Sequence, residues 1–457
     1  AFKPGDRLPS VRQTSEGRHV SPSTVFQAYY LLEARGLIRA RAKSGYYVTG
    51  SATQLPPEVE MSGRSPGGAA MLDVSEHVFE VLESSMHHDV VPFGSAFPSP
   101  LLFPMQRLAR TMAASVQKHD PRRVFDDLTP GNPDLRRQIA LRYLVDGLQL
   151  APEDIIITNG ALEALNLCLQ AVTRPGDAVV IESPCFYAAL QSIERNGLRA
   201  IEVPTHPREG IELSMLERVL KEHRPKACWL MTNFQNPLGS LMPHDKKRAL
   251  VQLLAEHQVP LIEDDVYGEL YFGNTRPTLA KAFDSEGLVM HCSSFSKCLA
   301  PGYRVGWVAP GRFMREVARQ KLTLSLTTSA PAQITLAAYL DRGGYAPHLR
   351  QLRDTLATQR DAYIQAIVEH FPAGTRATRP AGGYFLWIEL PGQVDTLALH
   401  RDALAAGVSI APGPIFSASR RHRHCLRFNY GHPLDDRARA GLATLGMLIA
   451  AQMQADA

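Results

Sequence analysis

The chain has 457 residues, of which 45% are hydrophobic and 21% charged, a composition typical of folded proteins, and its length is enough for two to four domains of roughly 150 residues. No run approaches the roughly 20 apolar residues of a membrane span, and the first ten residues lack the apolar stretch of a signal peptide, so we expect a cytoplasmic protein with no membrane partner. The six scattered cysteines include no C-x-x-C pair and no His/Cys cluster at zinc spacing, which predicts reduced thiols and no structural metal.

The net charge of +4 is distributed unevenly. The first fifty residues contain eight lysines and arginines against three acidic residues, whereas the remainder is close to neutral. A small basic module on a neutral body is typical of a nucleic-acid-binding head joined to a metabolite-binding domain. A basic face that contacts only solvent explains the charge equally well, so the residue pattern has to decide between them.

The first fifty residues show the pattern of two short helices followed by a basic hairpin. Ser10 is a candidate N-cap for a helix through Glu16, and Ser21 caps a second helix whose first residue is Pro22. The second helix has apolar residues at helical spacing, and two strand-like runs, 37–41 and 46–49, follow it. This order predicts a winged helix-turn-helix.

The motifs PGDRLPS, SPSTVFQAY, LLEARGLI and SGYYV resemble the DNA-binding module of the GntR family of bacterial regulators, over nearly all of residues 4–49. The resemblance implies double-stranded operator DNA as a partner. It assigns phosphate contacts to Arg7, Ser10 and Arg12, major-groove contacts to Ser21, Ser23, Thr24 and Gln27, and the tip of the wing to Gly45 and Tyr46. Pro22 stands where family members usually carry a basic residue, and the family's first helix would precede Pro4, so we expect a missing segment before residue 1. A helical hairpin that does not bind DNA is the alternative.

Residues 50–71 are rich in Pro, Gly and Ser and lack hydrophobic periodicity, which predicts a flexible linker between a head of residues 1–49 and a body of residues 72–457. In the body, apolar strand-like runs alternate with helical runs. The strand-like runs are 154–158, 178–182, 227–232, 260–263 and 288–291, and helices start at Ala161, Phe186 and His244. The pattern predicts an α/β fold with a mostly parallel sheet, helices on both faces, and ligands beyond the carboxyl ends of the strands.

Reactive side chains follow two of these runs. Asp264 and Asp265 end the run LIEDD, and Lys297 follows VMHCSSFS. A lysine amine forms an imine with an aldehyde cofactor, and a carboxylate keeps a pyridine nitrogen protonated. Alone, a lysine is usually a surface residue and an acidic pair is often a helix cap. Their order along the chain indicates a cofactor that is both an aldehyde and a pyridine.

The same cofactor would need a phosphate site. Gly160 and Ala161 at a helix start offer backbone N–H groups and a favourable dipole, and Ser294, Ser296 and Arg304 add hydroxyls and a guanidinium. An isolated Arg304 would more often be a salt-bridge partner. Together with the lysine, these donors predict that the chain binds pyridoxal 5'-phosphate (PLP).

From about residue 72 to the end, the body resembles a fold-type I PLP-dependent aminotransferase, with a large subdomain of about 72–320 and a small α+β subdomain of about 321–457. The resemblance implies that Lys297 forms the Schiff base, that Asp264 contacts the ring nitrogen, and that Tyr267 of DDVY is the third catalytic residue. It also implies further contacts: Asn236 of QNPLG and Tyr267 to the phenolic oxygen of PLP, Phe186 of ESPCF stacked on the ring, and Arg427 of CLRFNYG on the α-carboxylate of a substrate or effector. A core aromatic and a surface arginine beside the RRHRH run are the alternatives for Phe186 and Arg427.

One departure concerns the segment FDDLTPGNPDLR. The family usually presents a tyrosine here toward the phosphate of the partner subunit, and this chain has Asp126 or Asp127. A carboxylate repels a phosphate, so the departure puts transaminase competence in doubt.

A GntR-type head, a linker and an aminotransferase-like body resemble the MocR subfamily of bacterial transcriptional regulators over the whole chain. The resemblance implies a homodimer in which PLP, or an amine or amino acid effector, changes how the heads engage DNA. The alternative is a working amino-acid aminotransferase with a vestigial head, in which Lys297 also acts as general base. A third possibility, a DNA-binding protein with an inactive body, is disfavoured because Lys297, Asp264 and Arg304 are all present.

Overall fold

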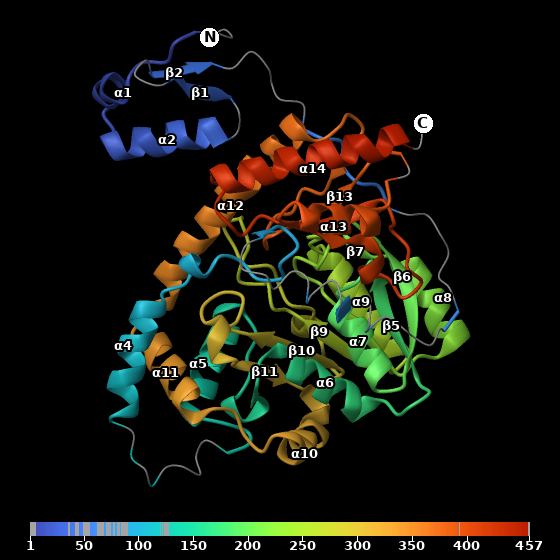
Figure 1. Cartoon of the computed structure of the whole chain (residues 1–457). Coiled ribbons are helices and arrows are strands. Elements are labelled where there is room, and N and C mark those ends of the chain that lie inside the picture. Colours follow the sequence, from blue (N-terminus) through green and yellow to red (C-terminus); the bar gives the residue numbers. More distant parts are fainter. Residues whose placement is uncertain are drawn as a thin grey trace.

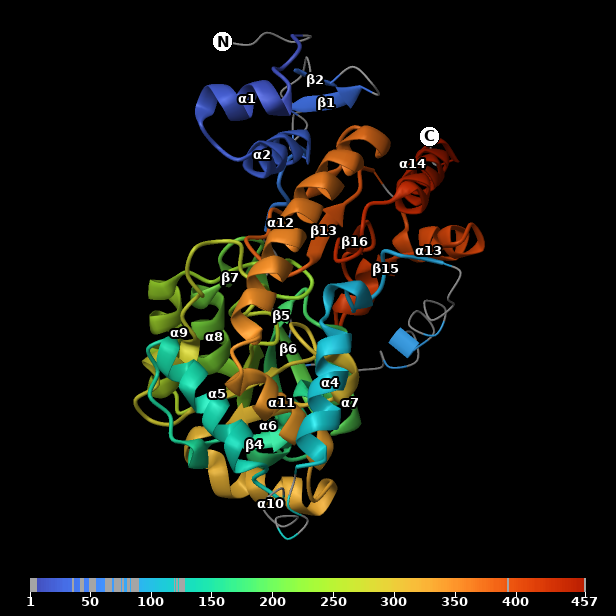
Figure 2. The same cartoon turned by 90° about the vertical axis from the view of Figure 1, so that its left-hand side faces the viewer.

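A computed structural model gives the arrangement of the chain (Figures 1 and 2). It describes residues 6–34, 37–41, 45–48, 55–61, 68–69, 75, 78–79, 83, 90–118, 120, 122, 128–392 and 394–455. In both views the N-terminal head lies beyond the small subdomain, with helix α2 (Pro22–Ala34) beside helix α12 (Tyr345–His370).

The head is a winged helix-turn-helix, as the residue pattern predicts. Helix α1 (Val11–Arg18) begins with a capping box, in which Gln13 N donates to Ser10 Oγ at 3.2 Å and Ser10 N donates to Gln13 Oε1 at 2.9 Å. Strands β1 (Ile38–Arg41) and β2 (Gly45–Val48) follow α2 in the chain and form the antiparallel wing. A small core centred on Val25, Tyr29 and Ile38 holds these elements together.

The large subdomain is built on an eight-stranded sheet within the described residues, with the order β4-β11-β10-β9-β8-β5-β6-β7. Its strands are β4 (Ile156–Thr158), β5 (Ala178–Ser183), β6 (Arg199–His206), β7 (Gly210–Ile211), β8 (Ala227–Leu230), β9 (Leu261–Asp264), β10 (Val289–Ser294) and β11 (Gly306–Ala309). The pairs from β10 through β9, β8 and β5 to β6 are parallel, which confirms the prediction of a mostly parallel sheet. The sequence pattern missed β6, β7 and β11, and both β7 and β11 run antiparallel to their neighbours.

Helices cover both faces of this sheet. Successive residues of a strand point to opposite sides, and apolar residues of the strands point to both, so both faces have to be buried. Val180 of β5 packs with α8 and α9, whereas Val179 and Ile181 pack with α6, α7 and α10. The helices of this subdomain in the described residues are α4 (Met105–Val116), α5 (Pro133–Val145), α6 (Ala161–Val172), α7 (Tyr187–Arg195), α8 (Leu213–His223), α9 (His244–Glu256), α10 (Met314–Leu324) and α11 (Ala330–Asp341). We expected residues from 321 onward in the small subdomain, but α11 packs against α4 and α5 of the large one. No helix of the described residues is long and apolar enough to cross a membrane.

The small subdomain has a four-stranded antiparallel sheet of order β12-β13-β16-β15. Its elements are α12, β12 (Arg376–Ala377), β13 (Phe385–Glu389), α13 (Thr396–Ala405), β14 (Val408–Ser409), β15 (Ala411–Pro412), the short 3₁₀ helix η7 (Gly413–Phe416), β16 (Cys425–Asn429) and α14 (Asp436–Ala455). Strand β3 (Val91–Pro92) pairs with β14, and Asn429 N donates to Phe93 O at 2.8 Å. Residues 91–93, which we expected in the large subdomain, therefore associate with the small one.

The linker region also differs from expectation. We expected residues 50–71 to be flexible, but within this range residues 55–61 pack on the body, with Val59 only 8% exposed. The N–H of Ala377 donates to Pro57 O at 3.0 Å. Composition did not reveal this packing because the contacts are to residues far away in the sequence.

Candidate functional site

Lys297 lies just beyond the end of β10, in a crowded and partly buried position. Its amine donates to Ala96 O at 3.0 Å and lies 3.8 Å from the centre of the Phe97 ring. Burial, followed by the positive charges of Arg427 and Arg304, lowers the pKa of Lys297 to about 7, while Asp264 opposes the shift. A lysine with a pKa of about 7 has a substantial fraction of neutral, nucleophilic amine at neutral pH.

The structure separates the roles of the two neighbouring acids at the end of β9. Asp265 accepts hydrogen bonds from Asn233 Nδ2 at 2.8 Å and Arg276 Nη2 at 2.8 Å, so its carboxylate is engaged in the fold. Asp264 is equally buried, yet its Oδ1 atom has no hydrogen-bond partner among the described residues. Burial, with a smaller contribution from Asp265, raises the pKa of Asp264 to about 7. Asp264 accepts hydrogen bonds from the Val266 N–H and the Trp229 side chain, but it is the acid that keeps one buried oxygen, Oδ1, available to a ligand.

A buried polar chain fixes Asp265 from a third side. The Trp307 indole donates to Tyr143 OH at 2.9 Å, so the Tyr143 proton is left for His291 Nδ1, which lies 2.6 Å away. His291 consequently carries its proton on Nε2 and donates it to Asp265 Oδ2 at 3.3 Å. This chain belongs to the scaffold and holds the end of β9 in place.

A phosphate-sized cradle forms where α6 begins. Gly160 has φ 81° and precedes the helix without any side-chain cap, which leaves the first backbone N–H groups free of a side-chain acceptor. A Cβ at this position would lie 2.4 Å from Nη2 of Arg304, so only glycine lets the guanidinium approach the helix start. Arg304 Nη1 also donates to Ser296 Oγ at 3.2 Å, and Ser294 Oγ accepts from Ser296 N at 3.4 Å. These donors suit an anion.

Arg427 lies on β16 and is fully buried. It donates to Gly94 O at 2.7 Å and to Asn236 Oδ1 at 3.3 Å, while its Nε atom has no partner in the part of the chain that is described. Asn236 in turn donates to Tyr267 OH at 3.5 Å. The guanidinium lies 4.4 Å from the ring centre of Phe385. A buried arginine with a free N–H and only neutral acceptors is poised for a carboxylate.

The remaining predicted ring contact is less enclosed. Phe186 precedes the first residue of α7 and is partly exposed, with its ring centre 4.8 Å from that of Tyr187. The residue pattern missed Ala96 and Phe97, because the Gly-, Ser- and Pro-rich stretch that carries them has no periodicity that points to a site. It also missed Tyr384, whose hydroxyl donates to Ala96 O at 3.1 Å.

Most of the predicted DNA-contacting side chains are exposed, and several of them also bond within the head. Arg7, Arg12, Thr24 and Gln27 are exposed. Arg12 pairs with Glu16 at 3.1 Å, and the Thr24 hydroxyl lies 2.7 Å from that of Ser21. Ser10 and Ser21 are also exposed, but their hydroxyls accept the N–H groups of Gln13 and Thr24. Gly45 is exposed at the wing, whereas the Tyr46 ring packs on Tyr29 with a centre distance of 5.2 Å. The side chain of Ser23, and both Asp126 and Asp127, lie outside the described residues.

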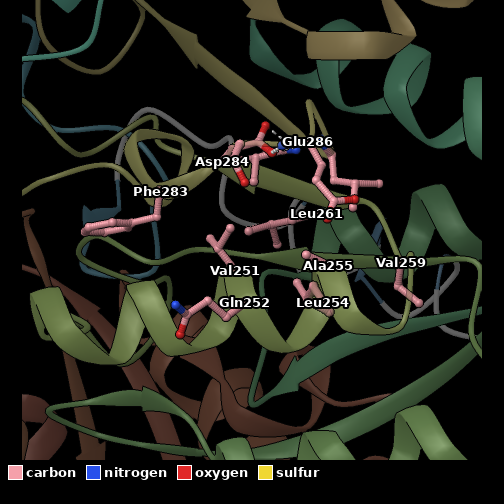
Figure 3. Close-up of a pocket in the computed structure, with 12 residues that line it drawn as sticks. Val251, Gln252, Leu254, Ala255, Val259, Leu261, Phe283, Asp284 and Glu286 are labelled. Atoms are coloured by element: carbon pink, nitrogen blue, oxygen red, sulfur yellow. Dashed lines mark hydrogen bonds between the residues drawn. The ribbon is translucent and has the colours of Figure 1, made fainter.

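A separate cavity of about 50 Å³ lies beside α9, away from these residues (Figure 3). Most of its lining is apolar, and Asp284 at its edge accepts the N–H groups of Glu286, Leu288 and Val289. The acid stabilises a turn, and the volume is too small for a cofactor.

The division of roles between the two acids leads to a stability prediction. Asp265→Asn breaks the buried pair with Arg276 and should lower the free energy of unfolding by about 3–5 kcal/mol. Asp264→Asn removes a buried charge that has a free oxygen, so the PLP-free protein should be unchanged or more stable. Urea denaturation of both PLP-free variants measures the difference. Equal destabilisation would contradict the assignment.

Comparisons with known proteins place this geometry in a family. Residues 102–440 match the model of aminotransferase class I and II, and residues 1–48 match that of the bacterial regulatory proteins of the gntR family. The chain is 46% identical to the uncharacterised HTH-type transcriptional regulator YdcR of Escherichia coli (strain K12), over 98% of this chain and 95% of that protein.

Two further similarities involve a second regulator and a solved enzyme. The chain is 38% identical to the uncharacterised HTH-type transcriptional regulator YjiR of the same organism, over 99% of this chain and 96% of that protein. The crystal structure of Pyrococcus horikoshii kynurenine aminotransferase matches with a TM-score of 0.76 and 30% identity, covering 82% of this chain and 94% of that one. The chain therefore belongs to the aminotransferase class I and II family and carries a GntR-family head, the architecture of the MocR subfamily of HTH-type regulators.

Proposed function

We propose that the protein is a PLP-dependent transcriptional regulator, whose head binds operator DNA and whose body binds PLP together with an amine or amino acid effector. The observation that carries the proposal is the cluster at the strand ends, where Lys297, Asp264, Arg304 and Arg427 gather in a chain that also has a GntR-family head. The family's usual dimer would present two heads to repeated or palindromic half-sites.

The pocket fits PLP by its charges and by its free polar atoms. Asp264 Oδ1 is available to a ring nitrogen, and the cradle at Gly160 and Arg304 is available to a phosphate. Asn236 and Tyr267 are suited to a phenolic oxygen. PLP, when bound, supplies an electron-accepting ring at this position. Lys297 then holds the cofactor covalently, and Arg427 orients the carboxylate of an effector beside it.

The head fits DNA by its charge and by its exposed polar residues. Arg7 and Arg12 are exposed cations near the start of α1, where phosphate contacts fix the orientation of such domains. Thr24 and Gln27 lie on the exposed side of α2, the second helix, which enters the major groove in proteins of this type.

A working aminotransferase is the second candidate, because the pocket keeps the residues that such chemistry needs and the body matches a solved aminotransferase at 30% identity. In that case the neutral amine of Lys297 would also move the proton of the substrate.

The deciding experiment uses the full-length, PLP-loaded protein. It is titrated with duplex DNA from upstream of its own gene and with a random duplex, before and after amino acids are added. We expect tight, sequence-selective binding that changes with the ligand, and Lys297→Ala should remove the absorbance of bound PLP. Multiple turnover of amino acid and keto acid, with only weak non-selective DNA binding, would favour the enzyme.

The pKa of Lys297 leads to a pH prediction. Only its neutral amine forms the covalent link, so PLP incorporation into the PLP-free protein should become faster as pH rises through about 7, not through the usual lysine value of 10.5. Arg427→Gln removes one cause of the lowered pKa, so the midpoint should move to higher pH. Stopped-flow absorbance measures both rates, with a free amine as control for the ionisation of PLP. A midpoint in the ordinary lysine range would contradict the burial argument.

Arg427 leads to a ligand prediction. Arg427→Ala should weaken the absorbance response to amino acids roughly 10- to 100-fold, the scale of a lost charged hydrogen bond, while simple amines respond as before. The amines serve as the internal control. An equal loss for both classes of ligand would mean that Arg427 does not bind a carboxylate.

Arg12 leads to a DNA prediction. The Arg12 side chain is exposed and, among the described residues, pairs with Glu16. Arg12→Ala should therefore leave the fold intact, weaken binding to specific and random duplexes alike, and reduce the salt dependence of the affinity by a slope of about 1. Arg137→Ala is the matched control, since Arg137 is an exposed arginine paired with Asp134 within a helix of the body. Anisotropy titrations over a range of salt concentrations provide the test. Unchanged affinity in Arg12→Ala would remove Arg12 from the interface.

A further inference from the structure

The described part of the linker, residues 55–61, is attached to both subdomains of the body. On the side of the small subdomain, Ala377 N donates to Pro57 O at 3.0 Å and Arg379 Nη2 donates to Pro56 O at 3.1 Å. On the side of the large subdomain, Arg208 Nε donates to Glu58 Oε2 at 2.8 Å. The segment therefore bridges the two subdomains.

The two attachments are made by adjacent residues. Pro57 is bonded to the small subdomain and Glu58 to the large one, and their Cα atoms are separated by about 3.8 Å of fixed chain. Proline also restricts the backbone at this point. The backbone between these two residues cannot lengthen, so a shift of one subdomain relative to the other has to displace the Glu58–Arg208 side-chain pair or the hydrogen bond to Pro57.

The side chain of Val59 makes a third attachment, because it is buried where the two subdomains pack against each other. It is 8% exposed and belongs to a buried cluster that contains residues from both sides. The large subdomain contributes Tyr187, Ala188 and Leu238, and the small subdomain contributes Trp387, Ala411, Ile415, Phe416 and Cys425. Complete burial of a valine side chain stabilises a protein by about 1.5–3 kcal/mol, which is enough to hold a linker in place.

The same cluster extends to the candidate ligand site. The Phe416 ring packs on Trp387 with a centre distance of 5.5 Å and lies 5.2 Å from the Arg427 guanidinium. Phe186, the expected ring-stacking residue, packs against the cluster from the large subdomain. Contacts made by a ligand at Arg427 and at Lys297 thus fall on opposite sides of the contact that the linker bridges.

We propose that residues 55–61 form a strap that registers the relative position of the two subdomains and passes it to the DNA-binding head. The proposal rests on the proposed function and adds to it a route by which ligand binding reaches the head. A carboxylate at Arg427 competes with the acceptors that the guanidinium now uses, Gly94 O of the small-subdomain side and Asn236 Oδ1 of the large one. The ligand therefore changes contacts across the same boundary. The attachments of the strap to the two subdomains then differ between the ligand-free and the ligand-bound protein.

The test uses the full-length protein with two strap variants. Arg208→Gln removes the attachment to the large subdomain, and Val59→Ala weakens the buried one. Arg248→Gln is the matched control, because Arg248 is an exposed arginine of the same subdomain whose ion-pair partner, Asp245, lies in its own helix. DNA affinity is measured for PLP-free protein, PLP-loaded protein, and PLP-loaded protein with an equimolar mixture of the twenty protein amino acids.

We expect the unsubstituted protein and Arg248→Gln to show a change in DNA affinity between states of roughly 5- to 150-fold, the usual range of coupling between sites. In Arg208→Gln and Val59→Ala the ratio of the DNA affinities in the different ligand states should fall toward one, while PLP still binds. The charge reversal Glu58→Arg with Arg208→Glu should restore the ratio, which separates a lost contact from a general folding defect. Hydrogen exchange in residues 55–61 should also respond to the ligands.

The outcomes separate the two proposals. A ratio near one in the unsubstituted protein would refute the proposed function itself. If both strap variants keep the affinity ratio of the unsubstituted protein, or if hydrogen exchange in residues 55–61 does not change with any ligand, the strap proposal is wrong. The proposed function as a regulator would then still stand.

Discussion

An excess of positive charge at the carboxyl ends of β9 and β10 is the constraint on which the rest of the body depends. Among the described residues, Lys297 interacts electrostatically with Arg427, Arg304 and only one acid, Asp264. Arg427 is fully buried and Lys297 partly buried, whereas Arg304 is exposed, so the first two carry most of the cost of unpaired charge, and anions that the chain does not provide stabilise the arrangement. A phosphate beside Arg304 and a carboxylate beside Arg427 meet this requirement, and each position keeps donors free for it.

The scaffold holds these charged residues in place because the polar groups next to them have hydrogen-bond and ion-pair partners. Asp265 is neutralised by Arg276 and fixed by Asn233 and His291, so the end of β9 stays in place although its neighbour Asp264 has a free oxygen. Gly160 and Arg304 depend on each other in the same way, because the guanidinium occupies the space where a Cβ would lie. Structural and ligand-binding roles are thus divided between adjacent residues.

The pocket alone does not distinguish a regulator from an enzyme, since both need the same lysine, acid and arginine. The distinction lies in how the pocket is connected to the rest of the chain. The head has its own small core, and the linker that leads to it is held at Pro57, Glu58 and Val59 across the boundary between the subdomains. An enzyme with a vestigial head has no need for a linker that bridges the two subdomains of its body.

The sequence by itself determined the features that depend on neighbouring residues. The Ser10 cap, the proline at the start of α2, the alternation of strands and helices, and the order of Asp264, Lys297 and Arg304 could all be predicted, because caps, periodicity and strand-end motifs act within a few residues. The family resemblance had already assigned the ring contact to Asp264, but only the tertiary structure showed that Asn233 and Arg276 engage Asp265, that Ala96 and Phe97 contact Lys297, and that residues 55–61 are packed. Lys297 and Ala96 are 201 residues apart, and Arg379 and Pro56 are 323 apart. Such contacts are fixed by the path of the chain through the fold, and no local pattern encodes that path.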